Sequence, residues 1–426
     1  MRNLHKSRSR ADLLSSIILF LAISTIGIKW IPLVKFGGIS LEISNIVQLL
    51  IIFVFFPLII LKNNFRAHSS MFMNLLFSLV VLMTSVLIIR GDGGSTGILR
   101  LSIFSLISCY VLINIDSRAL LSSKYLVPSA LSVFVAVIVF SYYSAGISFF
   151  TEVRDYLVTQ NRIQFVYGGV RPALNAFSST SQDGGFEYLA SIINAIAGVF
   201  ALFFILSSTL SYKYGKIMLL CSLVSLFFVF ILFSLSALLI CLLSGIIFIA
   251  NYVRHTNISR SKVVAILIVF PVLALNFIPL RDFAYTALLD NQASADHRVD
   301  QYANAAALLN ESPFFGSGYV LIDGFQIHNL LVFTWVSGGV FLFLGVFFVY
   351  IMAFTLMLEG IHGSFIKGSR RIEYLLMATL PIVFLIRCSV GGAGGLPAGS
   401  SSLAIALAIL AKSNLELRFF KKLNSN

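Results

Sequence analysis

Charged side chains are scarce in this sequence: they make up 11% of its 426 residues, whereas 58% of the residues are hydrophobic. The mean hydropathy is +0.95, and apolar stretches near the length of a membrane span recur along the chain. This composition excludes a soluble globular protein. We therefore expect an all-α, polytopic integral membrane protein that forms a single domain over residues 1–426.

Cysteine is also rare, and several ligand-binding motifs are missing. The four cysteines (Cys109, Cys221, Cys241 and Cys388) lie in or beside apolar runs without metal or redox spacing, which favours buried thiols. The sequence has no phosphate-cradling GxxxxGKS motif, no Asp-x-Asp pair and no cluster of His, Cys and carboxylate ligands. We therefore expect no nucleotide, no cofactor and no required metal.

Acidic residues are fewer than basic ones, 17 against 30, which gives a net charge of +13. No basic face or stacking aromatic platform stands apart from the short loops, so the excess of positive charge does not predict a nucleic-acid partner.

The apolar runs predict twelve spans, approximately at 13–29, 40–61, 71–89, 98–115, 126–145, 187–207, 217–233, 236–250, 263–280, 330–358, 374–389 and 400–411. Most basic residues then fall on one side, so the positive-inside rule predicts that both termini are cytoplasmic. The first apolar run resembles a signal peptide but lacks a cleavage site, and we interpret it as an uncleaved first helix.

Two parts of this topology leave alternatives open. The last hairpin, Glu373 to Ala411, has only just enough residues for two crossings around the Gly-rich GGAGGLPAG, so eleven spans or a partly re-entrant loop remain alternatives. The 29-residue apolar run from Leu330 to Leu358 is longer than one crossing needs. We expect it to tilt or to continue along the cytoplasmic interface.

On this topology only two loops are long, and both are extracytoplasmic: 146–186 and 281–329. Ten basic residues are expected outside the cytoplasm, and eight of them are arginine. The ten are Lys29, Lys35, Arg90, Arg100, Arg154, Arg162, Arg171, Arg281, Arg298 and Arg387. Because the planar guanidinium group suits phosphate oxygens, this bias predicts an anionic ligand at the outer membrane face. The alternative for each arginine is an ion pair with an acidic residue of these loops, such as Glu152, Asp155 or Asp300.

Arg100 and Arg387 lie close to or inside apolar runs. A charge at the centre of a span costs roughly 2.5 to 3.5 kcal/mol on insertion scales, so such residues usually reach the interface or face a cavity. We take both as further candidates for substrate binding.

The loop 281–329 begins at Arg281 and contains an expected amphipathic helix after Ser294, with Val299, Tyr302, Ala306 and Leu309 on its apolar face. Arg298 and Tyr302 are four residues apart and would share one side of that helix, where both could contact a substrate. The alternative is that Tyr302 packs on the membrane domain and that Arg298 pairs with Asp290 or Asp300.

Asn310 and Pro313 are expected to end this helix. Gly316 and Gly318 follow, and they permit a sharp turn or a close backbone approach to a ligand. His328-Asn329 then precede the next span. A histidine there is a candidate general base, although an interfacial hydrogen bond is the alternative role. The other long loop places Arg171 centrally and returns to the membrane at Glu187.

In their order and spacing these residues resemble the O-antigen polymerase and ligase superfamily of bacterial envelope glycosyltransferases. The resemblance rests on Arg298, Tyr302, Leu308-Leu309, Pro313, Gly316-Ser317-Gly318, His328-Asn329, Gly338-Gly339 and the Arg171 loop RPALNAFSS. The twelve-span plan, with two long periplasmic loops in a GT-C-like arrangement, is also similar. The chain departs from the family after the seventh span, where a Ser-Arg pair is common and this sequence has Phe233-Ser234-Leu235-Ser236-Ala237.

The resemblance implies a metal-independent glycosyltransferase of the bacterial inner membrane, which takes an undecaprenyl-pyrophosphate-linked glycan as its donor. His328 and Arg298 would be catalytic. The residues that would bind the pyrophosphate or glycan are Arg171, Arg281, Tyr302, Gly316, Gly318, Asn329, Arg100 and Arg387. Polymerisation of repeat units is the first expectation, with membrane lipids and a chain-length regulator as partners, and ligation of the polymer to lipid A core is the alternative. A flippase or transporter is a further alternative, but the sequence shows no internal repeat of the kind expected for one.

Overall fold

Most apolar runs of the length predicted for membrane spans form helices where the computed structural model describes them. The described residues are 15–24, 32–36, 39–50, 53, 121, 123–144, 148, 151, 154–155, 186–232, 234–255, 299–318, 327, 329–365, 371–390 and 400–423. The long helices are α7 (Leu126–Ser144), α11 (Phe186–Tyr214), α12 (Lys216–Leu232), α13 (Leu235–His255), α16 (Leu330–Ser364), α17 (Arg371–Val390) and α18 (Ser400–Leu423). A shorter helix covers Ser15–Ser24. The expected spans at 71–89, 98–115 and 263–280 lie outside the described residues.

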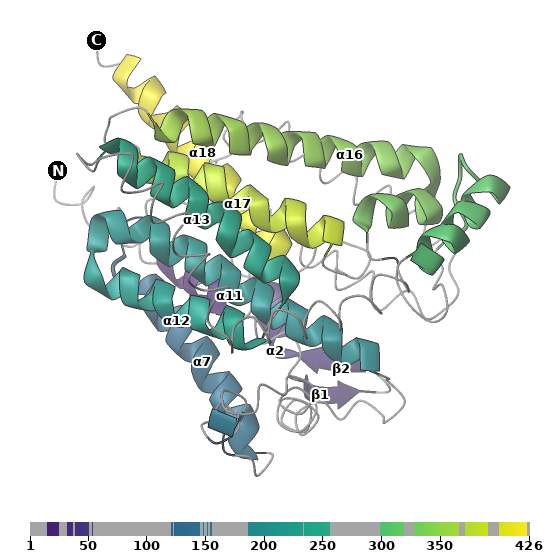
Figure 1. Ribbon diagram of the computed structural model, residues 1–426, viewed down its shortest axis with the longest axis horizontal. Helices are drawn as coiled ribbons and strands as arrows, with labels where there is room; N and C mark the ends of the chain where they lie inside the picture. The colour runs from purple at the N-terminus through teal and green to yellow at the C-terminus, as the bar shows by residue number, and fades with distance from the viewer. Residues whose placement is uncertain are drawn as a thin grey trace, which may run out of the picture.

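Four of these helices are long and apolar enough to cross a membrane: Ala195–Tyr214 within α11, Leu235–His255, Leu330–Ser364 and Arg371–Ser389. The helices pack side by side as a bundle (Figure 1), with α11 against α12, α16 against α17, and α17 against α18. The chain is therefore a helical membrane protein.

A short β-hairpin departs from the all-α expectation. Strands β1 (Pro32–Phe36) and β2 (Ile39–Glu42) pair antiparallel, and Phe36 is opposite Ile39. The two residues between them in the sequence are Gly37-Gly38, a pair that is typical of two-residue hairpin loops. The prediction of a span from residue 40 onward was therefore wrong at its start, since helix α2 begins only at Ile43 and runs to Leu50.

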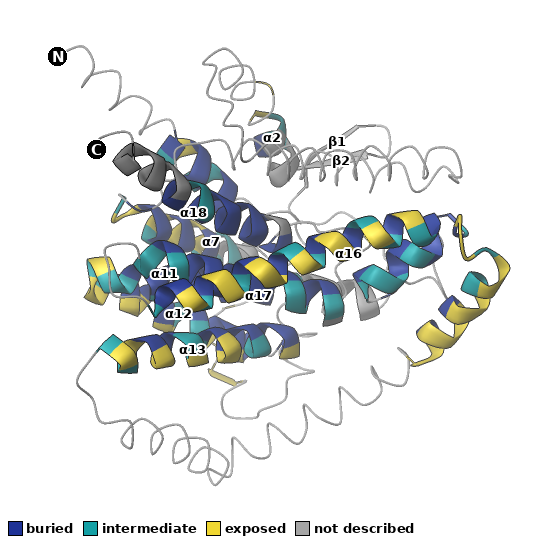
Figure 2. Ribbon diagram, turned by 90° about the horizontal axis from the view of Figure 1, so that it is seen from above, coloured by how far each residue is buried: buried dark blue, intermediate teal, exposed yellow. Residues whose placement is uncertain are grey.

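The buried core lies between α11, α17 and α18. Every described residue of α18 from Leu403 to Ala411 is buried, which makes this helix central. The helices α12, α13 and α16 instead expose a stripe of large apolar side chains, as Figure 2 shows for α16. Such stripes are expected where a helix faces lipid.

Glycine allows the closest helix contact in the bundle. A Cβ atom on Gly360 of α16 would lie 2.3 Å from the backbone nitrogen of Ala378 in α17. One on Gly363 would lie 2.1 Å from the ring of Tyr374. Small residues with this spacing let two membrane helices approach along their backbones, which increases their van der Waals contact.

One end of the bundle carries a network that joins four helices, and we call it the basic end because it gathers Lys213, Lys216, Arg254, His255 and Arg371. The guanidinium group of Arg371 lies 4.1 Å from the ring centroid of Tyr212, and its Nε donates to Oδ1 of Asn251. The Nδ2 group of Asn251 donates to the carbonyl oxygen of Ser364 over 2.6 Å. The network thus connects α11, α13, α16 and α17.

Candidate functional site

Helix α16 is broken near its start. Gly339 has φ 72° and ψ −168°, so residues 330–338 form a separate half-helix that precedes the long part, 340–364. Trp335 and Phe343 have ring centroids 4.9 Å apart, which a straight helix would not allow for residues eight apart. Figure 1 shows the half-helix folded back along the long part at one end of the bundle. We call this end, opposite the basic end, the far end.

The break shows where the helix divides, whereas the sequence predicted that its surplus length would tilt or continue along the cytoplasmic interface; neither alternative is tested by the break. The long part has 25 residues, about 37 Å at 1.5 Å per residue, which is enough for one crossing by itself. The surplus therefore lies before Gly339, at the amino end of α16. The helix breaks at position 339 because the residue there is glycine, and only glycine adopts a positive φ without a steric cost.

The loop segment Pro313 to Gly318 covers the break. The N–H groups of Ser317 and Gly318 donate to the carbonyl oxygens of Val336 and Ser337 over 2.6 and 3.1 Å. In return, the N–H of Val340 donates to the carbonyl oxygen of Phe314 over 3.2 Å. Backbone groups left without helix partners by the break are thus satisfied by the loop.

Gly316 and Gly318 make the sharp turn expected of them, with φ of 68° and 82°. Gly316 is also where two backbones meet, because a Cβ atom there would lie 2.6 Å from the backbone nitrogen of Gly339. Both glycines therefore have a structural reason to be glycine. Their contact with a substrate stays a prediction.

The loop helix covers residues 299–311 and precedes this turn. Gln301 and Ala305 are buried on it, and Leu308 packs on the same side against Ala305, Ile327, Phe333 and Val336. Of the expected apolar face only Leu309 packs against this cluster, whereas Val299 is 65% exposed and Tyr302 is 39% exposed, so the prediction was wrong for those two residues. The buried face of the helix is therefore shifted by one residue from the face that its largest apolar side chains predicted. Tyr302 remains accessible to solvent as a result.

Asn329 is the N-cap of α16. Its Oδ1 accepts hydrogen bonds from the backbone N–H groups of Leu331 and Val332, at 2.9 and 3.3 Å. Because N-capping satisfies the free donors of the first turn, this role accounts for asparagine at the position. Its side-chain oxygen is engaged within the protein, while its predicted contact with the glycan remains open.

Arg387 lies in the last turn of α17 and is buried, with 4% of its surface exposed. Its Nη1 donates to Oγ of Ser236 at the start of α13 over 3.3 Å, and its Nε has no partner. Within the described residues no carboxylate pairs with it. A Cβ atom on Gly198 of α11 would lie 3.1 Å from this Nε and 3.2 Å from Oγ of Ser400, so both atoms lie against the same stretch of α11.

The structure does not bring Arg387 together with the loop 313–318. Ser389, two residues later, donates to the hydroxyl of Tyr350 over 3.4 Å. Tyr350 lies eleven residues after Gly339 in α16, which is about 16 Å along a helix. Arg387 is therefore deeper in the bundle than the covered break.

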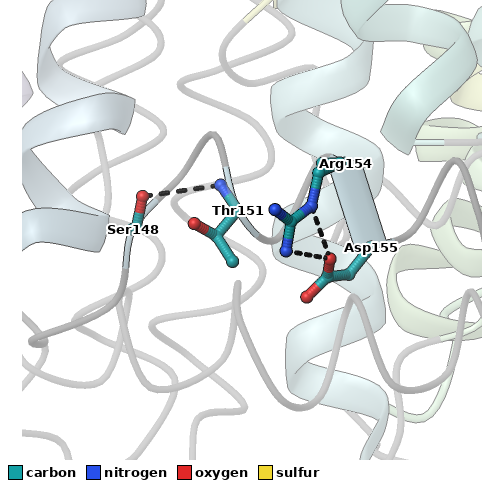
Figure 3. A network of polar contacts seen from close by, with 4 residues as sticks. All are labelled: Ser148, Thr151, Arg154 and Asp155. Carbon is teal, nitrogen blue, oxygen red and sulfur yellow. Dashed lines mark hydrogen bonds and ion pairs between the residues drawn. The ribbon is translucent and has the colours of Figure 1, made fainter.

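Arg154, one of the arginines expected outside the cytoplasm, has the alternative role of an ion pair. Arg154 donates through Nε and Nη2 to Oδ1 of Asp155 over 2.9 and 2.8 Å, as Figure 3 shows. Nearby, the N–H of Thr151 donates to Oγ of Ser148 over 3.4 Å. Both members of the ion pair are exposed, and such surface pairs contribute little to stability.

No protein-family model and no curated protein matches this sequence. The candidates Arg100, Arg171, Arg281, Arg298 and His328 lie outside the described residues. Among the described residues, no group of three His, Cys, Asp or Glu side chains could hold a metal ion. Of the candidate site residues, the structure therefore describes Tyr302, Gly316, Gly318 and Asn329 at the far end, and Arg387 deeper in the bundle.

Sequence reasoning missed the serines around Arg387. Ser234, Ser236 and Ser400 are buried and lie at or beside the amino ends of α13 and α18. Serine is a common residue at such positions, so nothing in the sequence singled these three out. The structure also places Arg387 beside Ser236.

Proposed function

We propose that this chain is a glycosyltransferase that polymerises undecaprenyl-pyrophosphate-linked oligosaccharide repeat units into O-antigen or a related surface polysaccharide. The observation that carries the proposal is the docking of the loop 313–318 on the broken start of α16. This docking holds the exposed Tyr302 and the cap residue Asn329 at one end of the bundle. Asn329 follows His328 in the sequence, and Tyr302 follows Arg298 by one helical turn.

The far end would face the periplasm. Its opposite, the basic end, gathers lysines and arginines, and the positive-inside rule assigns such an end to the cytoplasm. The twelve spans, the cytoplasmic termini and the bacterial inner membrane belong to the same proposal. Under this orientation the break in α16 and its covering loop lie on the side where lipid-linked glycans are assembled.

The proposed chemistry uses a base and several cations. His328 removes the proton from the acceptor hydroxyl, whose oxygen forms a bond to the anomeric carbon of the donor sugar. The bond from that carbon to the pyrophosphate breaks, and the electron pair leaves with the pyrophosphate. Arg298, Arg171 and Arg281 stabilise the leaving charge through charge-assisted hydrogen bonds, each worth about 1.5 to 3 kcal/mol. Tyr302 is exposed and available to stack on a sugar ring.

The test is elongation of lipid-linked repeat units by the purified full-length protein in detergent. Arg298→Ala and His328→Ala should each abolish polymer while the protein still inserts at normal levels. Arg154→Ala and His297→Ala are the matched controls, because Arg154 pairs with Asp155 and His297 has no assigned role. Wild-type chain lengths from Arg298→Ala or His328→Ala would remove that residue from the mechanism.

Arg171→Ala should weaken donor binding in the same assay. Arg171→Lys should restore it only in part, because lysine cannot make the bidentate contact of a guanidinium group with phosphate oxygens. Full restoration by lysine would show that charge alone suffices at this position.

The ligase alternative shares the donor and differs in the acceptor. Loss of a polymerase should leave lipopolysaccharide capped by one repeat unit. Loss of a ligase should leave bare core while lipid-linked polymer accumulates. The lipopolysaccharide profile of a deletion strain therefore separates the two activities.

One observation favours the transporter alternative, namely the broken helix α16, since discontinuous helices surround substrate sites in many transporters. Those breaks lie near the middle of the bilayer. The break at Gly339 instead precedes a 25-residue stretch that can cross the membrane alone. Elongation in detergent, where no transmembrane gradient exists, would exclude transport as the activity, and persistent inactivity there would favour it.

A further inference from the structure

The buried guanidinium group of Arg387 has far more hydrogen-bonding capacity than its described surroundings use. It carries five N–H donors, and its partner among the described residues is the neutral hydroxyl of Ser236. Its Nε is fully enclosed and without an acceptor. A buried charge that is neither paired nor fully hydrogen-bonded is costly, so the position calls for an anion.

Two helix amino ends add to this positive charge. Ser236 is the second residue of α13, and Ser400 is the first residue of α18. The first turn of a helix carries unpaired N–H groups and a partial positive charge. The backbone of Gly198 brings Oγ of Ser400 and Nε of Arg387 close to each other. The guanidinium group of Arg387 and the partly positive amino ends of α13 and α18 thus lie close together beside α11.

The depth of this cluster in the bundle indicates which anion would fit. Arg387 follows Arg371 by sixteen residues along α17, which is about 24 Å from the basic end. A bilayer's hydrocarbon core is about 30 Å thick, so Arg387 lies in the part of it nearest the far end. A phosphate group attached to a membrane lipid is the anion normally found at the boundary of this region.

We propose that Arg387, Ser236 and the amino ends of α13 and α18 form a binding site for a phosphate or pyrophosphate group. Arg387 supplies charge-assisted hydrogen bonds to the phosphate oxygens, and the hydroxyl of Ser236 positions its guanidinium group. The ligand chemistry is that of a lipid-linked phosphate, the class to which the donor of the proposed function belongs. Binding itself does not depend on that activity.

The experiment measures binding to the full-length protein in nanodiscs of phosphatidylcholine, with geranylgeranyl pyrophosphate as the probe. Inorganic pyrophosphate and vesicles with phosphatidylglycerol serve as competitors that distinguish the sources of phosphate. Arg387→Gln should weaken probe binding about ten- to a hundredfold, the range expected for loss of a charged hydrogen bond. Arg387→Lys should retain part of the affinity, because lysine keeps the charge but loses the planar fork.

A stability measurement separates a ligand site from a structural role. If Arg387 exists to bind an anion, Arg387→Gln should leave the Tm of the ligand-free protein unchanged or raise it, since an uncompensated buried charge is removed. It should also abolish the rise in Tm that the probe produces in the wild type. A lower Tm together with unchanged probe affinity would overturn the proposal.

A second pair of variants keeps the test valid if Arg387→Gln fails to fold. Gly198→Ala places a methyl group 3.1 Å from Nε of Arg387 and should weaken probe binding several-fold. Gly245→Ala is the matched control, because nothing lies within 4 Å of the added atom. Equal affinities in the two variants would count against the site. A further outcome separates the two proposals. If the wild type binds the probe but does not elongate glycans, and the Arg387 variants lose that binding, then this site is supported and the proposed function is refuted.

Discussion

Asn329 joins a structural and a proposed functional role in one side chain. As the N-cap of α16 it satisfies two backbone donors of the half-helix, so Asn329→Ala should lower the free energy of unfolding by about 1 kcal/mol. Asn329→Asp should keep this stability, since aspartate caps equally well. Thermal unfolding in detergent measures both effects. If Asn329→Asp is stable but fails to elongate glycans, the amide also contacts the substrate; equal activity would limit the residue to capping.

Gly339 is the residue on which the broken start of α16 depends. Gly339→Ala would place a Cβ atom 1.9 Å from the carbonyl oxygen of Phe314, at a φ of 72° that alanine rarely adopts. We expect a loss of more than about 2 kcal/mol in the free energy of unfolding, together with release of the covering loop.

Limited proteolysis of the loop 313–318 measures this release, and Gly245→Ala provides the control with open space around the added methyl group. A loop equally resistant in wild type and Gly339→Ala would show that the contact between the loop and α16 does not depend on the glycine.

Individual residues were the least predictable level from sequence. The turn at Gly316 and Gly318 follows from their residue type. That these glycines contact the backbone of α16 does not, because the contact joins segments whose approach is set by tertiary packing. The Ser236 hydroxyl beside Arg387 is 151 positions away in the chain, and no local pattern signals such a pair.

At the scale of elements, helices were predictable and their interruptions were not. Apolar runs placed α7, α11, α12, α13 and α17 within a few residues of their observed ends, except that α11 continues to Tyr214. The break in α16 was missed because hydropathy is continuous across Gly338-Gly339. The loop helix was predicted, yet its packed face was wrong in part, because Gln301 and Ala305 are buried in place of Val299 and Tyr302.

The network at the basic end is the element-scale feature most open to test. Arg371 stacks on Tyr212 and bonds to Asn251, so Arg371→Ala should lower the free energy of unfolding by about 2 kcal/mol. Arg371→Lys should recover less than half of the loss, because an ammonium group lacks the planar surface that stacks on the ring. Thermal unfolding of the purified protein provides the measurement. A fully stable Arg371→Lys protein would show that charge near the membrane surface is what matters there.

For the whole molecule, the decisive measurement is the side of the membrane on which each end lies. A chain with its cysteines replaced would receive a single cysteine at Ala303 in the loop helix or at Lys216 at the basic end, both exposed positions. A membrane-impermeant maleimide added to spheroplasts should label Ala303→Cys and leave Lys216→Cys unlabelled until the membrane is permeabilised. The reverse pattern would place the proposed site in the cytoplasm and refute the glycosyltransferase.

The covered break has a mechanical consequence. The hydrogen bonds between the loop 313–318 and the carbonyl groups of Val336 and Ser337 tie the loop to the half-helix. Any force applied to the loop would reach α16 through these hydrogen bonds. Since α16 packs backbone to backbone on α17 at Gly360, strain applied at the far end would be transmitted down the length of the bundle.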